Sequence, residues 1–212
     1  MRKRYKIWLT IIVILLIFTI GIGVLKLFIG SDNNKKPQNV TSIITSIDEF
    51  GYTLDDRDTD YMKTEFKKLE EVISQEEINY EEYAKAIAKL FVIDFYTLNN
   101  KINKYDVGSL EYILSDKKDM FKNKAMDTIY GDIIDNTYKD RVQDLPEVTA
   151  VEIINYEVTE ITLNKNKVES YKLTMKYTYK KDLGYDKEGT IYLVKNNNKL
   201  EVALYNPKID KA

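Results

Sequence analysis

Residues 171–180 of the chain read YKLTMKYTYK, a strict alternation of apolar and polar side chains. Because successive side chains of a β-strand point to opposite faces, this alternation predicts a strand with one buried face and one face in water. A single wet face is typical of antiparallel sheets. The side chains on the predicted buried face are Tyr171, Leu173, Met175, Tyr177 and Tyr179.

The flanking sequence supplies neighbours for this strand. In segment 149–163 the apolar side chains change parity, first between Ile153 and Ile154 and again before Ile161, which predicts a bulge or a strong bend. An asparagine-rich turn at 164–167 separates this segment from the strand at 171–180. A second one, at 196–198, separates two later strands near 189–195 and 199–206. Together these segments predict a four-stranded antiparallel meander.

The segments before the meander have helical spacing. Apolar residues at i, i+4, i+7 and i+11 predict an amphipathic helix over about 60–74, and a second helix is expected over about 80–98. A third is expected from a Ser115 cap to about Asn136. The apolar residues expected on the inner face of this third helix are Phe121, Ala125, Ile129 and Ile133.

Two shorter segments complete the expected order of elements. Part of 40–54 alternates and predicts a strand, and 106–112 predicts a helical turn capped by Asp106. Helices followed by a bent meander indicate an α+β fold, with about three helices packed on a curved antiparallel sheet of four or more strands. We expect residues 40–212 to form this domain.

The N-terminal segment has the composition of a membrane anchor. Residues 7–29 are apolar apart from two threonines and Lys26, and about 23 helical residues suffice to cross a bilayer. The basic tail 1–6 is expected in the cytoplasm by the positive-inside rule, and 30–39 is expected to be a flexible linker. The domain would then lie outside the cell membrane.

A cleaved signal peptide is the alternative interpretation of this segment, with Gly21-Ile22-Gly23 as the cleavage site. Cleavage there would leave the apolar residues 24–29 exposed at the new N-terminus. We therefore expect an uncleaved single-pass anchor, with the lipid bilayer as the partner of residues 7–29.

The composition excludes several classes of function. Residues 1–30 hold five of the 32 basic residues and none of the 34 acidic ones, so the rest of the chain has 27 basic against 34 acidic residues, a net charge of −7. This charge disfavours nucleic-acid binding. The chain has no cysteine and no histidine, which excludes the usual zinc sites and thiol or histidine nucleophiles. No cofactor is predicted.

One segment resembles a known family. The stretch LFVIDFYTLNNKINKYDVGSLEYILSD (90–116) resembles the helix, loop, D-V-x-x-L and turn of nuclear transport factor 2-like domains. This resemblance implies a cone-like sheet with a pocket, over roughly 58–206. The whole chain also resembles uncharacterised single-pass membrane proteins of low-GC Gram-positive bacteria. Enzymes of this superfamily often use a histidine, which this chain lacks, so the resemblance carries no catalytic residue to this sequence.

Asp94 is the most informative candidate for a site. Helical spacing puts it in an apolar stripe with Leu90 and Leu98, where a carboxylate must be paired, hydrogen-bonded, protonated or in a wet cavity. One interpretation is a structural acid that a tyrosine, a lysine, Arg141 or backbone N–H groups satisfy. The other is a polar group of the cone pocket. The candidate pocket residues are Asp94, Tyr96 and Tyr177.

The acidic run 55–60 has the first three ligand spacings of an EF-hand calcium loop. However, Tyr61 stands where the loop requires glycine, and Lys67 stands where it requires glutamate. Acids at a helix N-terminus favour the helix dipole, so we interpret the run as structural and predict no metal site.

These observations favour a membrane-anchored, extracytoplasmic binding or interaction domain without catalytic activity, whose partner is an unidentified protein or small ligand. One alternative is a subunit of a cell-envelope assembly that resembles the cone-domain proteins of type IV secretion and conjugation systems. A third hypothesis is a small-molecule-binding or isomerase-like enzyme that uses Asp94 with a pocket tyrosine.

Overall fold

The helical part of the domain begins with two capped helices. The computed structural model describes residues 40–208, so the predicted span 7–29 and linker 30–39 lie outside the described residues. Helix α2 (Asp60–Ile73) begins at Thr59, whose hydroxyl accepts a hydrogen bond from the Met62 amide. Helix α3 (Tyr80–Tyr96) begins at Asn79, whose side chain accepts hydrogen bonds from two amides of the first turn. Both predicted helices are confirmed.

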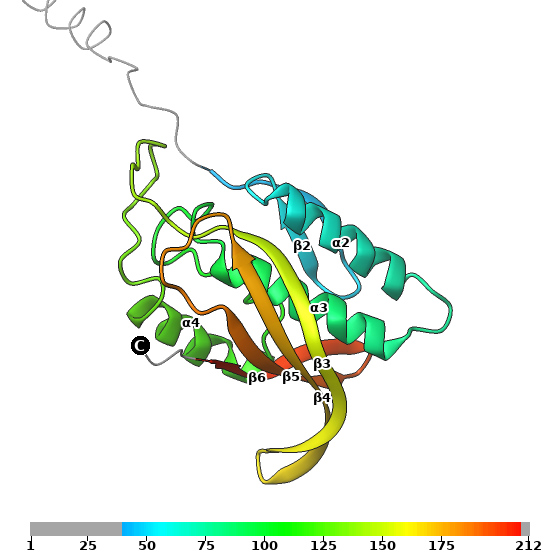
Figure 1. Ribbon diagram of the computed structural model, residues 1–212. Helices are drawn as coiled ribbons and strands as arrows, with labels where there is room; N and C mark the ends of the chain where they lie inside the picture. The colour runs from blue at the N-terminus through cyan, green and yellow to red at the C-terminus, as the bar shows by residue number, and fades with distance from the viewer. Residues whose placement is uncertain (1–39, 209–212) are drawn as a thin grey trace, which may run out of the picture. The chain divides into compact units, whose positions relative to one another are not determined.

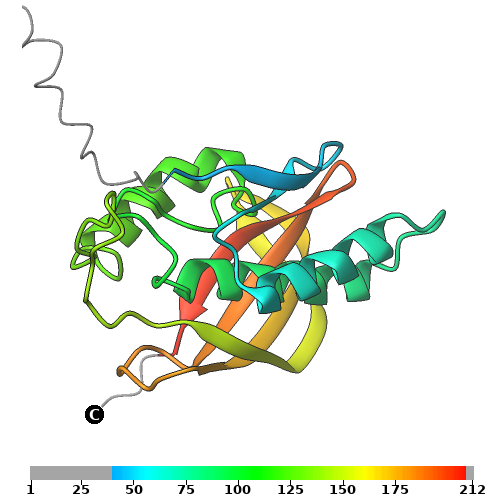
Figure 2. The ribbon, with the colours of Figure 1, turned by 90° about the horizontal axis from the view of Figure 1, so that it is seen from above.

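Helix α3 is the centre of the core. Of its 17 residues, 11 are buried, because α2 packs on one side and the sheet curves around the other. Figure 1 and the turned view in Figure 2 show α3 enclosed between α2 and the curved sheet. None of the helices in residues 40–208 has both the length and the apolarity that a membrane span needs.

The sheet is an antiparallel meander in the order β3-β4-β5-β6, as predicted. Its strands are β3 (Val148–Leu163), β4 (Asn166–Tyr179), β5 (Glu188–Asn196) and β6 (Lys199–Pro207). The register of β3 against β4 shifts between Ile153 and Asn155, where the first parity change predicts a bulge. The two-residue turn Asn164-Lys165 has positive φ at both positions, which an asparagine tolerates at low cost.

Of the two shorter elements before the meander, one was predicted correctly and one was not. Part of 40–54 is extended, as expected, and segment 40–55 forms a hairpin of two strands, β1 (Ile43–Ile47) and β2 (Tyr52–Asp55). The helical turn expected over 106–112 is absent: residues 108–112 form turns in which Ser109 has a positive φ, and the Asp106 carboxylate binds the Arg57 guanidinium at 2.6 Å.

The third helix is shorter than expected. A 3₁₀ turn, η1 (Ser115–Lys117), leads into α4 (Lys118–Asp127), and the Ser115 side chain does not cap it. The helix stops at Thr128, whose hydroxyl donates to the Lys124 carbonyl. Beyond it, Tyr130 is fully buried and its hydroxyl donates to the Phe95 carbonyl at 2.7 Å. If the helix continued, the Tyr130 hydroxyl would not reach this carbonyl. The coarse prediction of three helices and a curved four-stranded sheet holds for the described residues.

Candidate functional site

A cavity of about 450 Å³ lies between the end of α3, helix α4, strand β6 and the loop that joins β4 to β5. Helix α3 ends in Phe95 and Tyr96, both of which line it, and Asp186 from the loop closes one side. Lys124 of α4 and Asp186 are the charged residues in its lining. Aromatic rings make up much of the wall: Phe95, Tyr96, Phe121, Tyr185 and Tyr205. We call this cavity the aromatic pocket.

The hydroxyls of Tyr96 and Tyr205 form the polar floor of the aromatic pocket, and the Tyr177 hydroxyl lies behind them. The Tyr205 hydroxyl donates to Tyr96 at 2.9 Å and lies 2.9 Å from the hydroxyl of Tyr177. Tyr96 in turn donates to the Asp186 carboxylate at 3.4 Å, and Tyr177 donates to the Glu188 carbonyl at 3.2 Å. The hydroxyls therefore connect α3, β4, β5 and β6 at one end of the core.

These tyrosines stay neutral at physiological pH. Burial raises the pKa of Tyr177 to about 12, and burial together with the neighbouring tyrosines raises the pKa of Tyr96 and Tyr205 further above the usual value. A neutral phenol donates or accepts hydrogen bonds but offers no phenolate as a nucleophile or base. The floor of the pocket is suited to recognition of a polar group.

The position of Tyr205 depends on a glycine of the neighbouring strand. Gly189 of β5 lies so close that a Cβ there would be 2.8 Å from both the hydroxyl oxygen and Cε2 of Tyr205. Such an approach is far below van der Waals contact, so only glycine leaves this ring in place. Gly189, which pairs with Pro207 of β6, thus leaves room for the Tyr205 ring in the wall of the pocket.

Asp94 faces away from the aromatic pocket. Its carboxylate pairs with the Lys101 ammonium and accepts hydrogen bonds from the amide and, at 3.3 Å, the hydroxyl of Ser109. Residues 94 and 96 of a helix point in nearly opposite directions, so Asp94 and Tyr96 do not share a cavity. Burial alone would lower the pKa of Lys101, but the charge of Asp94 outweighs it and raises that pKa. These contacts match the structural interpretation of Asp94.

A second polar cluster adjoins this pair. A small cavity of about 180 Å³ is lined by Asp94, Lys101, Arg57 and Asp58, among others. Burial, followed by the charge of Asp94, raises the pKa of Asp58 to about 7. Its carboxylate accepts from the Asp55 amide at 2.8 Å, so the acidic run folds back on itself beside α2.

The structure brings together two of the three candidate pocket residues. The rings of Tyr96 and Tyr177 lie 5.1 Å apart, but only Tyr96 lines the aromatic pocket; Tyr177 lies behind it, in contact with Tyr205, and Asp94 lies elsewhere. An enzyme that combines Asp94 with a pocket tyrosine loses its geometric basis. Tyr205 and Asp186 also line the aromatic pocket and were not predicted from the sequence. A register shift between Tyr192 and Leu193 interrupts the pairing of β5 with β6, so simple alternation did not assign Tyr205 to the inner face.

Comparisons of the chain with models of protein families, with curated proteins and with solved structures gave no match.

Proposed function

We propose that the chain is a single-pass membrane protein whose outer domain binds a small organic molecule in the aromatic pocket and does not transform it. The observation that carries this proposal is a 450 Å³ cavity walled by five aromatic rings over a floor of neutral hydroxyls. Ligand sites in proteins are typically apolar cavities of this size with a few convergent polar groups.

The chemistry of the lining favours binding over catalysis. A hydrolytic or isomerising site needs a nucleophile or base with a pKa near the working pH, and the floor tyrosines titrate far above it. The chain contains no histidine or cysteine to take that role. A ligand with a flat apolar body fits the ring-lined wall, with a polar group directed at the Tyr96 and Tyr205 hydroxyls.

The membrane anchor is part of this proposal. Its support is the apolar run 7–29 with the basic tail 1–6 in front of it, which together favour a cytoplasmic N-terminus. The resemblance of 90–116 to nuclear transport factor 2-like domains supports a cone-like description of the domain. The sheet curves around α3, and the aromatic pocket lies at the C-terminal end of that helix, where a cone would open.

The proposal is tested by ligand-observed NMR on the full-length protein in lipid nanodiscs. We would screen ring-containing fragments against the wild type and against Thr128→Trp, which places a large ring at the exposed rim of the pocket. Thr149→Trp, at an exposed position of β3, is the matched control. Fragments whose saturation transfer disappears in Thr128→Trp but persists in Thr149→Trp support the proposal. Fragments that bind all three proteins equally, or no bound fragment, would refute it.

A further inference from the structure

The loop 132–144, between α4 and β3, presents apolar side chains to solvent although its backbone is tightly bonded. Gln143 bridges the loop, since its amide donates to the Asp132 carbonyl at 2.9 Å and accepts from the Ile134 amide at 3.0 Å. Its outward side chains include Ile134, Tyr138 and Val142, the last of them 98% exposed. Exposed apolar side chains gathered on a loop with a fixed backbone mark a surface that contacts a partner or a membrane.

Hydrogen bonds place this loop at the end of the domain where the chain enters it. Arg141 donates to the carbonyls of Asn99 and Lys101, and Arg57 donates to the intervening Asn100 carbonyl. The carboxylate of Asp56, next to Arg57, accepts hydrogen bonds from the amide and the hydroxyl of Ser42. Ser42 lies two residues after the first described residue. In both Figure 1 and Figure 2 the loop and the first strand begin at the same end of the domain.

Other exposed apolar side chains lie at the same end. Val40, Ile43 and Ile44 are exposed where the described chain begins. Tyr105 is exposed beside the loop, held there by the bond from Asn103 to Asp135. These residues and the three in the loop make up seven of the eleven large apolar side chains that are exposed within residues 40–208. We call this end of the domain the entry face.

We propose that the entry face lies on the surface of the bilayer that holds residues 7–29, with Ile134, Tyr138 and Val142 inserted among the lipid headgroups. The inference rests on the membrane anchor proposed above. Only ten residues, 30–39, separate the predicted span from the first described residue, and ten residues reach at most about 35 Å, so the domain begins close to that bilayer. Tethering at this distance gives an effective concentration on the order of millimolar, at which weak apolar insertion suffices.

The charge of the loop determines the kind of lipid contact. Residues 132–144 contain four aspartates against Lys139 and Arg141, a net charge of −2. Attraction to anionic headgroups therefore does not drive the contact. Tyrosine and aliphatic side chains partition into the interface of neutral lipid as well, so the contact should be insensitive to salt and should not need acidic lipids.

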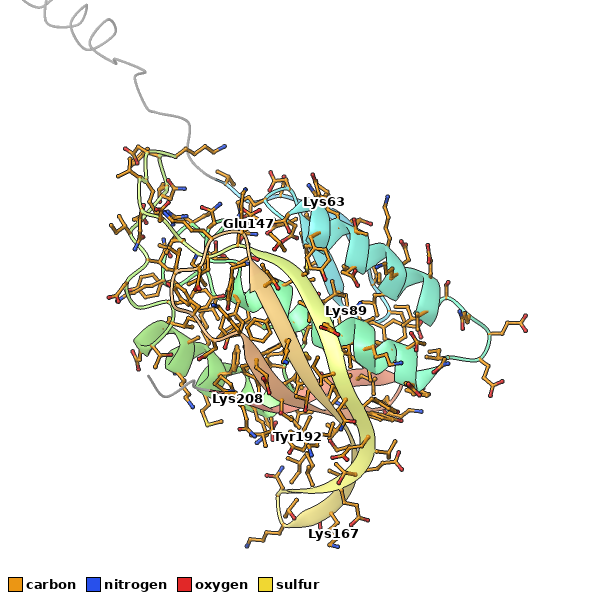
Figure 3. All side chains as sticks on the ribbon, in the orientation of Figure 1. Lys63, Lys89, Glu147, Lys167, Tyr192 and Lys208 are labelled. Atoms are coloured by element: carbon orange, nitrogen blue, oxygen red, sulfur yellow. The ribbon has the colours of Figure 1, made fainter. Side chains whose placement is uncertain are left out.

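The test uses the full-length protein in phosphatidylcholine liposomes. Two fluorophores are followed separately: Trp8 for the anchor and a dye on an introduced cysteine for the entry face. The chain has no cysteine and a single tryptophan, Trp8 in the predicted span. A lipid-sensitive dye on Val142→Cys reports on the entry face, and the same dye on Val158→Cys is the control. Val158 is 55% exposed on the β3–β4 hairpin, whose tip at Lys167 projects at the opposite end in Figure 3.

We expect nitroxide-labelled lipids to quench the dye at position 142 at least threefold more than at position 158, in low and in high salt. Ile134→Asp in the same background should reduce the quenching toward that of the control. Equal weak quenching at both positions, with Trp8 quenched by lipid, would overturn the entry-face contact but leave the anchor intact. If the dye at position 142 responds to the number of protein molecules per liposome and not to the quencher, the entry face contacts a second copy of the chain. That result would also overturn the contact with lipid. Unquenched Trp8 would instead refute the anchor.

Discussion

The hydroxyl of Tyr205 on β6 donates a hydrogen bond to the hydroxyl of Tyr96 in the last turn of α3, across 2.9 Å. This contact joins the last strand of the sheet to the central helix. It also lies in the floor of the aromatic pocket, so the same atoms stabilise the fold and face any ligand.

Removal of one hydroxyl should therefore affect stability and binding together. We expect Tyr205→Phe to lower the free energy of unfolding by about 1–3 kcal/mol, because the contacts of its hydroxyl with both Tyr96 and Tyr177 are lost. Fragments that use the floor should bind at least fivefold more weakly. Denaturant unfolding and NMR titration measure the two effects. Tyr192→Phe, on the other face of the sheet (Figure 3), should change neither.

Gly189→Ala tests the wall of the same pocket from the neighbouring strand. The added methyl would lie 2.8 Å from the ring of Tyr205, so the ring must move. We expect a loss of about 1–3 kcal/mol in stability from this overpacking and a loss of fragment binding. Fragment binding that is unchanged in this variant would mean that the ligand does not contact Tyr205.

Asp94→Asn tests whether this carboxylate belongs to the fold. Lys101 and Asp94 have side chains only 6% and 16% exposed, so removal of the negative charge leaves a buried ammonium without its partner. Loss of one member of a buried pair costs about 3–5 kcal/mol, which predicts a midpoint of thermal unfolding lower by roughly 10 °C. The double variant Asp94→Asn/Lys101→Met should recover most of that loss. A midpoint that does not fall in Asp94→Asn would indicate a carboxylate retained at a cost to folding.

The free energy of unfolding should fall as the pH rises from 4 to 7, because of Asp58. Burial, followed by the charge of Asp94, raises its pKa in the folded state to about 7, so the folded protein holds a proton that the unfolded chain has released. A folded-state pKa above the unfolded value stabilises at low pH, and the gain disappears as pH rises through the folded pKa. The slope approaches 1.4 kcal/mol per pH unit for one proton. Carboxyls whose pKa is lowered in the folded state, such as Asp106, change the stability only at pH values below this window.

Thermal unfolding of the wild type and of Asp58→Asn from pH 4.5 to pH 8 measures this dependence. The asparagine keeps an oxygen that accepts from the Asp55 amide, and it does not titrate. We therefore expect a flatter profile and a more stable protein at pH 8. Parallel profiles would show that Asp58 has an ordinary pKa in the folded protein.

The regular elements of this fold were predictable because their signals are local. The alternation of residues 171–180 specified β4, the spacing of Met62, Phe66 and Leu69 specified α2, and asparagine specified the tight turns. The register shift in β3 followed from one change of parity, and it was also predictable.

The errors arose where a distant residue decides the local structure. Asp106 binds Arg57, 49 positions away, instead of capping a helical turn. Helix α4 ends early because Tyr130 reaches the Phe95 carbonyl and accepts from the Gly108 amide. The pocket of Tyr96, Tyr205 and Asp186 depends in the same way on contacts over 90 positions or more, which no local pattern encodes.

The orientation of the chain in the membrane gives the last prediction. Because the sequence has no cysteine, a single introduced cysteine is the only thiol available to a membrane-impermeant maleimide. Lys167→Cys lies at the exposed hairpin tip and loses only a surface ion pair with Glu160, which contributes about 0–1 kcal/mol. Lys3→Cys lies in the basic tail.

With a cytoplasmic N-terminus, intact cells should label position 167, and position 3 should react only after the membrane is permeabilised. Labelling of both in intact cells would contradict the anchor. The reverse pattern would mean that the four basic residues in the tail 1–6 do not set the orientation, and the domain would then face the cytoplasm. Release of the position-167 label with the soluble fraction would favour cleavage after Gly21-Ile22-Gly23. In that case the entry face would have no bilayer tethered beside it, and its apolar side chains would need a different partner.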